Sequence, residues 1–141
     1  MVVRSASGLR GPCHPDLTPP VIDTVTATPA CLWPPNNKLV ALGLGSGLVV
    51  ESHDACDPAP TARIIGVSSN QALGSGDATF TDDRVCLRAS QLGAPSGRTY
   101  TVTVEVRDAA GNVAQKTVDF RVPRSKDPSC PTLPITAFGC P

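Results

Sequence analysis

Apolar and polar residues alternate most regularly between residues 98 and 122 of the chain. The apolar positions of the first half are Tyr100, Val102, Val104 and Val106. Because successive side chains of a strand point to opposite faces, this spacing predicts a half-buried β-strand. Val118, Phe120 and Val122 repeat the pattern and predict a second strand. Residues 108–112 (DAAGN) have the composition of a turn, so we expect an antiparallel hairpin.

Weaker patterns of the same kind predict the other strands, about seven in all. Residues 21–28, 62–69 and 84–89 are expected to form strands, with residues 78–81 as a minor edge strand. Residues 39–50 are apolar but are interrupted by Gly43, Gly45 and Gly47. This interruption predicts either a strand with a bulge or bend, or two short strands that change sheets. No window has the 3.6-residue apolar stripe of a helix, so the sequence predicts an all-β fold, an antiparallel β-sandwich.

The 141 residues suit one domain with a tail at each end. Residues 1–19 are rich in Gly, Pro and Ser and are expected to form an extended N-terminal arm, followed by the β-sandwich at residues 20–123. Alternation then stops, which predicts a C-terminal tail rich in Cys and Pro at residues 124–141. The first twelve residues have no apolar run suited to a signal peptide or membrane span, so we expect a mature fragment or an excised module.

Cysteine usage indicates the compartment. The six cysteines are Cys13, Cys31, Cys56, Cys86, Cys130 and Cys140. No two of them form a CxxC pair, and His14 and His53 are the only histidines, which argues against a structural zinc site. We therefore expect disulfides and a secreted or cell-surface protein. Six cysteines permit fifteen pairings, and the sequence alone does not choose among them.

Charge and composition exclude several function classes. The 12 Lys and Arg residues balance the 12 Asp and Glu residues, and aromatic residues make up 4% of the chain, so we expect neither nucleic-acid binding nor membrane insertion. Ser52, His53 and Asp54 are adjacent, and their side chains would alternate between two faces of an extended chain rather than form a catalytic triad. Only two glutamates are present, Glu51 and Glu105. We expect no enzymatic activity.

Several short motifs occur in a characteristic order. They are LWPPN at residues 32–36, DACDP at 54–58, GRTYT at 97–101 and DAAGN at 108–112. Across residues 19–123 the chain resembles bacterial extracellular Ig-like repeats, which are related to hyalin-repeat and fibronectin-type-III-like modules. Leu92, the corner at residues 93–97 and Tyr100 also resemble the tyrosine corner of such modules. The resemblance implies an Ig-like sandwich in a secreted, multidomain protein and brings no catalytic residues. The chain departs from the commoner form at Asn37, at Cys31 and in its cysteine-bearing tails.

An Ig-like topology would bring certain cysteines together. The start of the first strand, the loop at Cys56 and the turn at residues 108–112 would share one end of the sandwich, which places Cys13 near Cys56. Cys130 and Cys140 would close a small loop, which leaves Cys31 with Cys86. The expected outward face of Cys86 argues against the buried inter-sheet bridge of antibody domains. A tail cysteine bonded to a neighbouring subunit is the alternative.

Calcium is the candidate ion, although we expect no required cofactor. Asp54 and Asp57 lie in one loop, Asp108 and Asn112 lie in another, and the fold would place both loops at the same end. Calcium takes six to eight oxygen ligands from flexible loops. The alternative is that these aspartates cap turns through local backbone hydrogen bonds, and the lack of a DxDxDG run favours that interpretation.

Three functional hypotheses follow. The first is a non-catalytic structural, adhesive or assembly module whose partners are neighbouring domains or subunits of an extracellular assembly. The second is polysaccharide binding through Trp33, although a lone Trp beside two prolines more often packs over a sheet edge. The third is self-assembly into a filament or surface layer through the cysteine-bearing tails.

Overall fold

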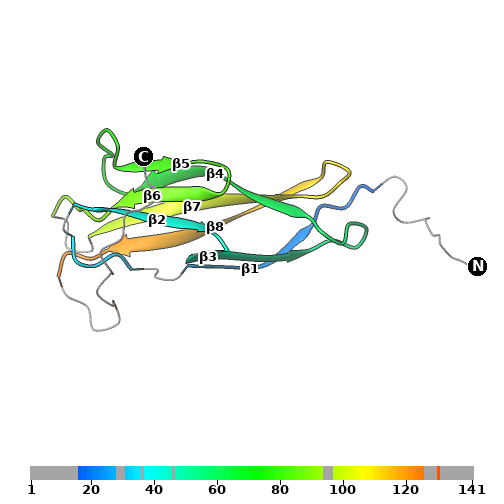
Figure 1. Ribbon diagram of the computed structural model, residues 1–141, viewed down its shortest axis with the longest axis horizontal. Coiled ribbons are helices and arrows are strands. Elements are labelled where there is room, and N and C mark those ends of the chain that lie inside the picture. The colour runs from blue at the N-terminus through cyan, green and yellow to red at the C-terminus, as the bar shows by residue number, and fades with distance from the viewer. Residues whose placement is uncertain are drawn as a thin grey trace, which may run out of the picture.

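Two β-sheets pack face to face (Figure 1), and apolar side chains from both sheets form the core between them. The computed structural model describes residues 16–27, 31–35, 37–45, 47–93, 97–125 and 130. Within these ranges there are eight strands: β1 (Val21–Ala27), β2 (Leu39–Leu44), β3 (Gly47–His53), β4 (Thr61–Ser69), β5 (Ala78–Phe80), β6 (Arg84–Arg88), β7 (Arg98–Arg107) and β8 (Val113–Val122). One sheet has the order β1-β3-β2-β6-β5 and the other β4-β7-β8. The predicted all-β sandwich is confirmed, with eight strands in place of about seven.

The predicted hairpin is β7 and β8. The two strands pair antiparallel from Arg98 opposite Val122 to Arg107 opposite Val113. β8 therefore starts earlier than its clear alternation, because backbone pairing with β7 continues up to the turn. Six of the inward side chains that the pattern selected are fully buried, namely Tyr100, Val102, Val104, Val106, Phe120 and Val122, whereas Val118 is partly buried.

The glycine-rich segment forms two short strands of the same sheet. β2 and β3 pair in parallel at only two positions, Gly43 with Gly47 and Leu44 with Leu48. Gly45 and Gly47 both have positive φ, at +82° and +93°, a conformation that glycine adopts without steric cost. The chain therefore steps sideways by one strand and continues in the same direction. The expectation of two short strands is confirmed, and the expected change of sheet is wrong.

The strand order follows a known arrangement once β2 and β3 are counted as one interrupted strand. The first sheet then reads β1, β2/β3, β6, β5 and the second β4, β7, β8. This is the ABED and CFG arrangement of a constant-type immunoglobulin sandwich. It places the β3–β4 loop, the β7–β8 turn and the chain before β1 at one end of the molecule, at the right in Figure 1.

Tyr100 links the core to a polar network at the opposite end. Its hydroxyl donates to the backbone oxygen of Arg88 at 2.7 Å and accepts from Nη1 of Arg98 at 3.1 Å. The Arg98 side chain is 1% exposed, donates to the oxygen of Ala72 at 3.1 Å and lies 3.6 Å from Oδ2 of Asp77. Burial raises the pKa of Tyr100. The hydroxyl-to-backbone bond is that of a tyrosine corner, but Leu92 is 66% exposed and does not pack beneath it.

We predict that Tyr100→Phe lowers the free energy of unfolding by about 2 kcal/mol, because it leaves a buried guanidinium N–H and a backbone oxygen without their partner. Urea denaturation followed by circular dichroism measures the change. Thr101→Val is the matched control, since the Thr101 hydroxyl bonds Asp119 on the exposed face, and it should change the midpoint little. Equal midpoints for Tyr100→Phe and wild type would show that the network does not stabilise the fold.

Candidate functional site

Three separate segments meet at one end of the sandwich. Oδ2 of Asp57, in the β3–β4 loop, accepts a hydrogen bond from the backbone N–H of Ala109, in the β7–β8 turn, at 2.8 Å. Nδ2 of Asn112 donates to the backbone oxygen of Asp16, ahead of β1, at 2.8 Å. We call this region, made of Asp16, Asp54, Asp57, Asp108 and Asn112, the acidic end. Its assembly from the two predicted loops is confirmed.

Asp54 and Asp57 hold the β3–β4 loop through local backbone bonds. Oδ2 of Asp54 accepts from the N–H of Cys56 at 3.1 Å and from the N–H of Asp57 at 2.9 Å. Oδ1 of Asp57 accepts from the N–H of Ala59 at 2.9 Å. These are the turn-capping bonds that the alternative to a calcium site predicted.

Asp108 organises the β7–β8 turn in the same way. Its Oδ1 accepts from the N–H groups of Ala110 and Asn112 at 3.0 and 2.9 Å, and its Oδ2 accepts from Nδ2 of Asn112 at 3.0 Å. Desolvation raises the pKa of Asp108, but the hydrogen bonds from Asn112, Asp16 and Ala110 outweigh it, so the pKa lies below its ordinary value. Asn112 therefore acts here as a hydrogen-bond donor.

Asp16 is the member of the acidic end that the sequence patterns missed. The N–H of Thr18 donates to Oδ1 of Asp16 at 3.1 Å and lowers the pKa of Asp16. Desolvation and the carboxylates of Asp108 and Asp54 outweigh that bond, so the pKa of Asp16 lies above its ordinary value of 3.8. Asp16 belongs to the predicted N-terminal arm, which has no periodicity, so no local signal marked it.

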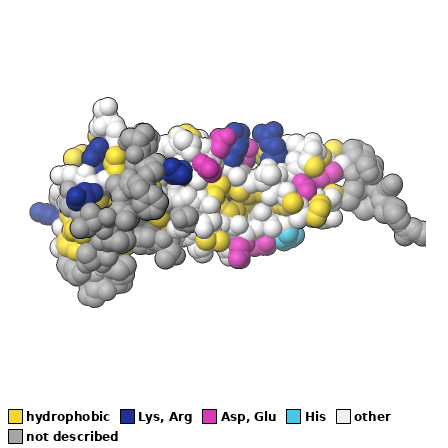
Figure 2. Space-filling view, in the orientation of Figure 1, with side chains coloured by type: hydrophobic (Ala, Val, Ile, Leu, Met, Phe, Trp, Pro, Cys, Tyr) yellow, Lys and Arg dark blue, Asp and Glu magenta, His cyan; other side chains and the backbone are white. Residues whose placement is uncertain are grey.

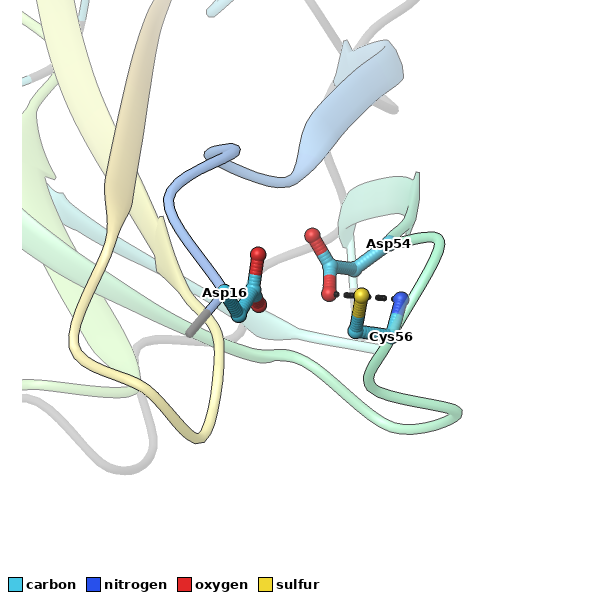
Figure 3. Close-up of side chains that lie close together, drawn as sticks. All are labelled: Asp16, Asp54 and Cys56. Atoms are coloured by element: carbon cyan, nitrogen blue, oxygen red, sulfur yellow. Dashed lines mark hydrogen bonds between the residues drawn. The ribbon is translucent and has the colours of Figure 1, made fainter. Parts of the chain in front are cut away.

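Hard oxygen donors dominate the acidic end (Figure 3). Ligand atoms of Asp16, Asp54 and Cys56 all lie within 4.8 Å of one another. Cys56 is disulfide-bonded, so its sulfur is not a thiolate and does not suit a zinc site. The carboxylates and loop carbonyls that remain are the donor type that calcium takes. Calcium binding by Asp54, Asp57, Asp108 and Asn112 stays a prediction, to which the structure adds Asp16.

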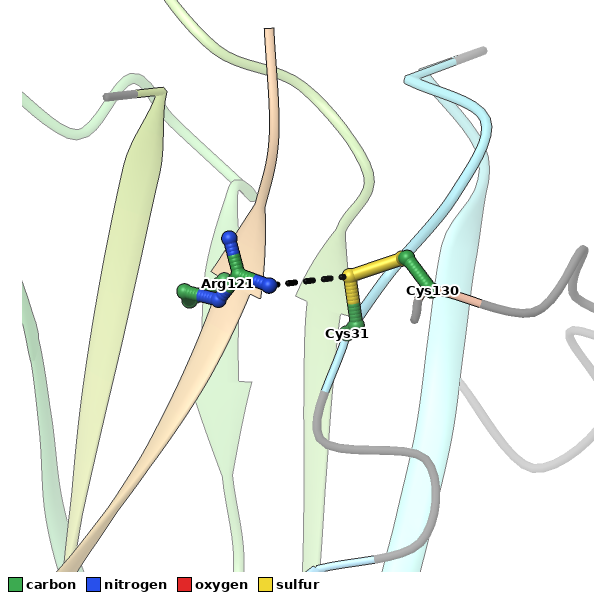
Figure 4. The surroundings of a disulfide bond; sticks show 3 residues. All are labelled: Cys31, Arg121 and Cys130. Carbon is green, nitrogen blue, oxygen red and sulfur yellow. Dashed lines mark hydrogen bonds between the residues drawn. A yellow bond between two sulfur atoms is a disulfide. The ribbon is translucent and has the colours of Figure 1, made fainter. Parts of the chain in front are cut away.

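Cys31 and Cys130 form a disulfide (Figure 4), with their Cα atoms 5.4 Å apart. The expected pairs Cys130–Cys140 and Cys31–Cys86 are therefore wrong. The reason is that the chain after β1 crosses to the other sheet, where Cys31 forms a parallel bridge with Arg121 of β8. This crossing brings Cys31 to the place where β8 ends and the chain continues toward Cys130.

The other cysteines are only partly covered by the described ranges. Cys56 and Cys86 are also disulfide-bonded, whereas Cys13 and Cys140 lie outside the described residues, so the expected Cys13–Cys56 pair stays a prediction. Cys86 is on the sheet face opposite to Val85 and Leu87 but is only 2% exposed. An outward position in the alternation therefore did not mean exposure to solvent.

Trp33 is half-buried and follows Leu32, which is fully buried. This position fits a ring that packs against the sandwich. Polysaccharide binding through Trp33 stays a prediction. On the face shown in Figure 2, Lys and Arg side chains lie toward the left and the upper centre, and Asp and Glu side chains lie in the centre and toward the right.

No family model, curated protein or solved structure matches this chain. Within the described ranges, no helix has the length and hydropathy needed to span a bilayer.

We predict that Asp16→Asn raises the melting temperature at pH 7 in the presence of a chelator. Because the pKa of Asp16 is raised in the folded protein, the folded state favours the protonated side chain. The protonated side chain therefore stabilises the fold below pH 3.8, and this contribution is lost as the pH rises through the folded-state pKa. The variant should therefore exceed wild type at pH 7 and match it at pH 3. Asp119→Asn, on the exposed face of β8, is the control. A lower melting temperature for Asp16→Asn than for wild type at pH 7 would contradict the raised pKa of Asp16.

The calcium hypothesis predicts that millimolar calcium raises the melting temperature of the wild-type protein, because an ion that binds only the folded state stabilises it. Asp16→Asn should reduce this increase, and magnesium should produce less of it because it dehydrates reluctantly. Differential scanning calorimetry over a calcium titration measures the effect. If melting curves with calcium and with chelator coincide, the aspartates act as turn caps alone.

Proposed function

We propose that this chain is a non-catalytic, disulfide-linked Ig-like module of a secreted or cell-surface protein, with a structural, adhesive or assembly role. Its partners are neighbouring domains or subunits of an extracellular assembly. The observation that carries the proposal is the Cys31–Cys130 disulfide, which joins residues 99 positions apart. Such bonds persist in oxidising compartments and are rare where the cell keeps thiols reduced.

The surroundings of the disulfide support a structural role. Cys31 is 6% exposed and Cys130 is 1% exposed, so small thiols have little access to either sulfur. A covalent loop of this length stabilises a fold mainly by restricting the unfolded chain. This contribution matters in a core whose only fully buried aromatic side chains, within the described ranges, are Tyr100 and Phe120.

The sheet edges favour contact through the ends or faces of the module over edge-to-edge pairing. β1 has an irregular register at Asp23, and β5 is only three residues long. The N–H of Ile64 in β4 bonds the oxygen of Asp82, and the oxygen of Arg121 in β8 accepts from Leu32. Short, interrupted or covered edges hinder the addition of a strand from another chain. Filament formation through the tails stays a prediction, because most of their residues lie outside the described ranges.

We predict that the double variant Cys31→Ala/Cys130→Ala loses about 2–4 kcal/mol of unfolding free energy, as expected when a large covalent loop is opened. Urea denaturation measures the loss of unfolding free energy in the variant. The same measurement on wild-type protein under reducing conditions provides the comparison. Alkylation of the protein as isolated, followed by mass spectrometry, should show a peptide pair linked through Cys31 and Cys130.

Two results would contradict the proposed function. Free thiols at both positions in protein isolated without reductant would remove the argument for an oxidising compartment. Hydrolytic turnover that disappears when a single Asp or His is substituted would show that the module is an enzyme.

A further inference from the structure

Exposed apolar side chains gather at the two ends of the sandwich. Among the described residues seven large apolar side chains are exposed, and five of them lie at the ends: Leu17, Val21, Leu73, Leu92 and Val113. β7 runs from one end to the other, so its ten residues, at about 3.4 Å each, separate the ends by about 30 Å. Apolar side chains that gather on a surface mark contact sites, whereas single scattered ones do not.

The acidic end carries the first apolar group. Leu17 and Val113 directly follow Asp16 and Asn112, which are joined by the hydrogen bond from Nδ2 of Asn112 to the oxygen of Asp16. Val21 is the first residue of β1, which starts at the same end. The three apolar side chains are 77%, 39% and 50% exposed in the order Leu17, Val113, Val21. They therefore share this end with the carboxylates already described.

The opposite end carries the second apolar group, Leu73 and Leu92, which are 42% and 66% exposed. Gln71 ties their two loops together: its Nε2 donates to the oxygen of Gly97 at 3.3 Å, and its Oε1 accepts from the N–H of Leu92 at 2.8 Å. Both apolar side chains are therefore presented by loops that are fixed to each other.

Positive charge dominates this opposite end, which we call the basic end. Arg88 and Arg98 both lie near the carboxylate of Asp77, at 3.0 and 3.6 Å. Lys38 precedes β2 and Arg124 follows β8, at the end where β2 starts and β8 stops. The described loops and strand termini at this end thus contain four cations and one carboxylate.

The acidic end has the reverse balance. Its described loops and strand termini contain four carboxylates, and Arg107 is their one cation. Nη2 of Arg107 lies 3.4 Å from Oε1 of Glu105, which offsets its charge. The charges are thus separated along the molecule, and Figure 2 shows Lys and Arg side chains toward the left and acidic side chains toward the right.

The two ends match each other in apolar character and oppose each other in charge. We propose that the acidic end of one copy docks onto the basic end of a second copy, so that successive copies join head to tail. Because the two surfaces differ and lie at opposite ends, this contact does not close on itself and extends into a linear array. The inference deepens the proposed function, on which it rests, by naming the partner of the module as a second copy of this chain.

Each end is small, so a single contact is weak in solution. A few apolar side chains ringed by charges belong to the class of small interfaces, below about 1,200 Å². Copies attached to a common surface or joined in tandem meet at effective concentrations of about 1 mM, at which weak contacts form.

Sedimentation equilibrium on the full oxidised chain tests the proposal, with a chelator present and at concentrations up to about 1 mM. The average mass should rise with concentration beyond that of a dimer. Raising the salt from about 0.1 M to about 1 M shortens the Debye length from about 10 Å to about 3 Å, so it should lower the average mass. A monomer at every concentration, or association that requires calcium, would overturn the proposal.

Two double variants block one end each. Leu73→Glu/Leu92→Glu puts carboxylates on the basic end, and Leu17→Ser/Val113→Thr removes apolar side chains from the acidic end. Each variant alone should associate about tenfold more weakly than wild type or worse, because a blocked end stops growth of the array. Mixed in equal amounts, the two variants should form dimers and nothing larger, since each supplies the end that the other lacks.

Val49→Glu/Phe80→Glu is the matched control. Both side chains are exposed but belong to β3 and β5 rather than to the end loops, so this variant has the same added charge and should associate as wild type does. Circular dichroism confirms that all variants are folded. Unchanged association of either end variant, or a mixture that stays monomeric, would show that the ends do not dock. The alkylation experiment reports on export independently, so that result leaves the assignment to an oxidising compartment standing.

Discussion

The covalent loop between Cys31 and Cys130 is the constraint on which the rest of the structure depends. The core is built from Val, Leu and Ile side chains, and Tyr100 and Phe120 are the aromatic members of its buried cluster. A core of this kind buries less apolar area per residue than one rich in aromatics, so a smaller hydrophobic contribution opposes the chain entropy lost on folding. The disulfide reduces the chain entropy lost on folding, because it removes conformations from the unfolded state. It also fixes where the chain crosses from one sheet to the other, since Cys31 sits at the bridge to β8.

The core also depends on a buried charge, which lies near the end of β8 where Cys31 forms its bridge. Arg98 is almost fully buried, and its Nε is the one buried side-chain nitrogen or oxygen in the described residues that has no partner. An arginine in such a place is tolerated only when its charge is compensated. The carboxylate of Asp77 compensates this charge. The hydrogen bond from the backbone N–H of Gly74 has the largest lowering effect on the pKa of Asp77, and the hydrogen bond from Arg88 and the charge of Arg98 lower this pKa further. The same contacts hold the loop before β5, so one buried cation orders a segment that has no apolar pattern of its own.

The sequence predicts the parts of the fold that depend on local alternation. The segments from Tyr100 to Val106 and from Val118 to Val122 identify the central hairpin, because the alternation of buried and exposed side chains in a strand appears as alternation of apolar and polar residues along the sequence. The disulfide pairing is different, since Cys31 and Cys130 are distant in sequence and meet only because the chain crosses to β8 after β1. Cys86 shows the same limit: its place in the alternation gives the face of the sheet but not what covers that face. Asp16 had no signal, because it joins the acidic end through contacts with residues far along the chain.

The acidic end shows how one set of carboxylates can cap turns and still remain electrostatically unsatisfied. Desolvation raises the pKa of Asp108, but hydrogen bonds from the side chain and backbone N–H of Asn112, from Asp16 and from the N–H of Ala110 outweigh it, so this pKa falls below its ordinary value. Hydrogen bonds do not suffice for Asp16, which faces both Asp108 and Asp54 and whose pKa rises. Repulsion of this kind is relieved when a proton or a cation binds. The capping bonds and the ion hypothesis are therefore compatible: the caps determine where the loops lie, and a bound cation or proton would relieve the repulsion that remains at Asp16.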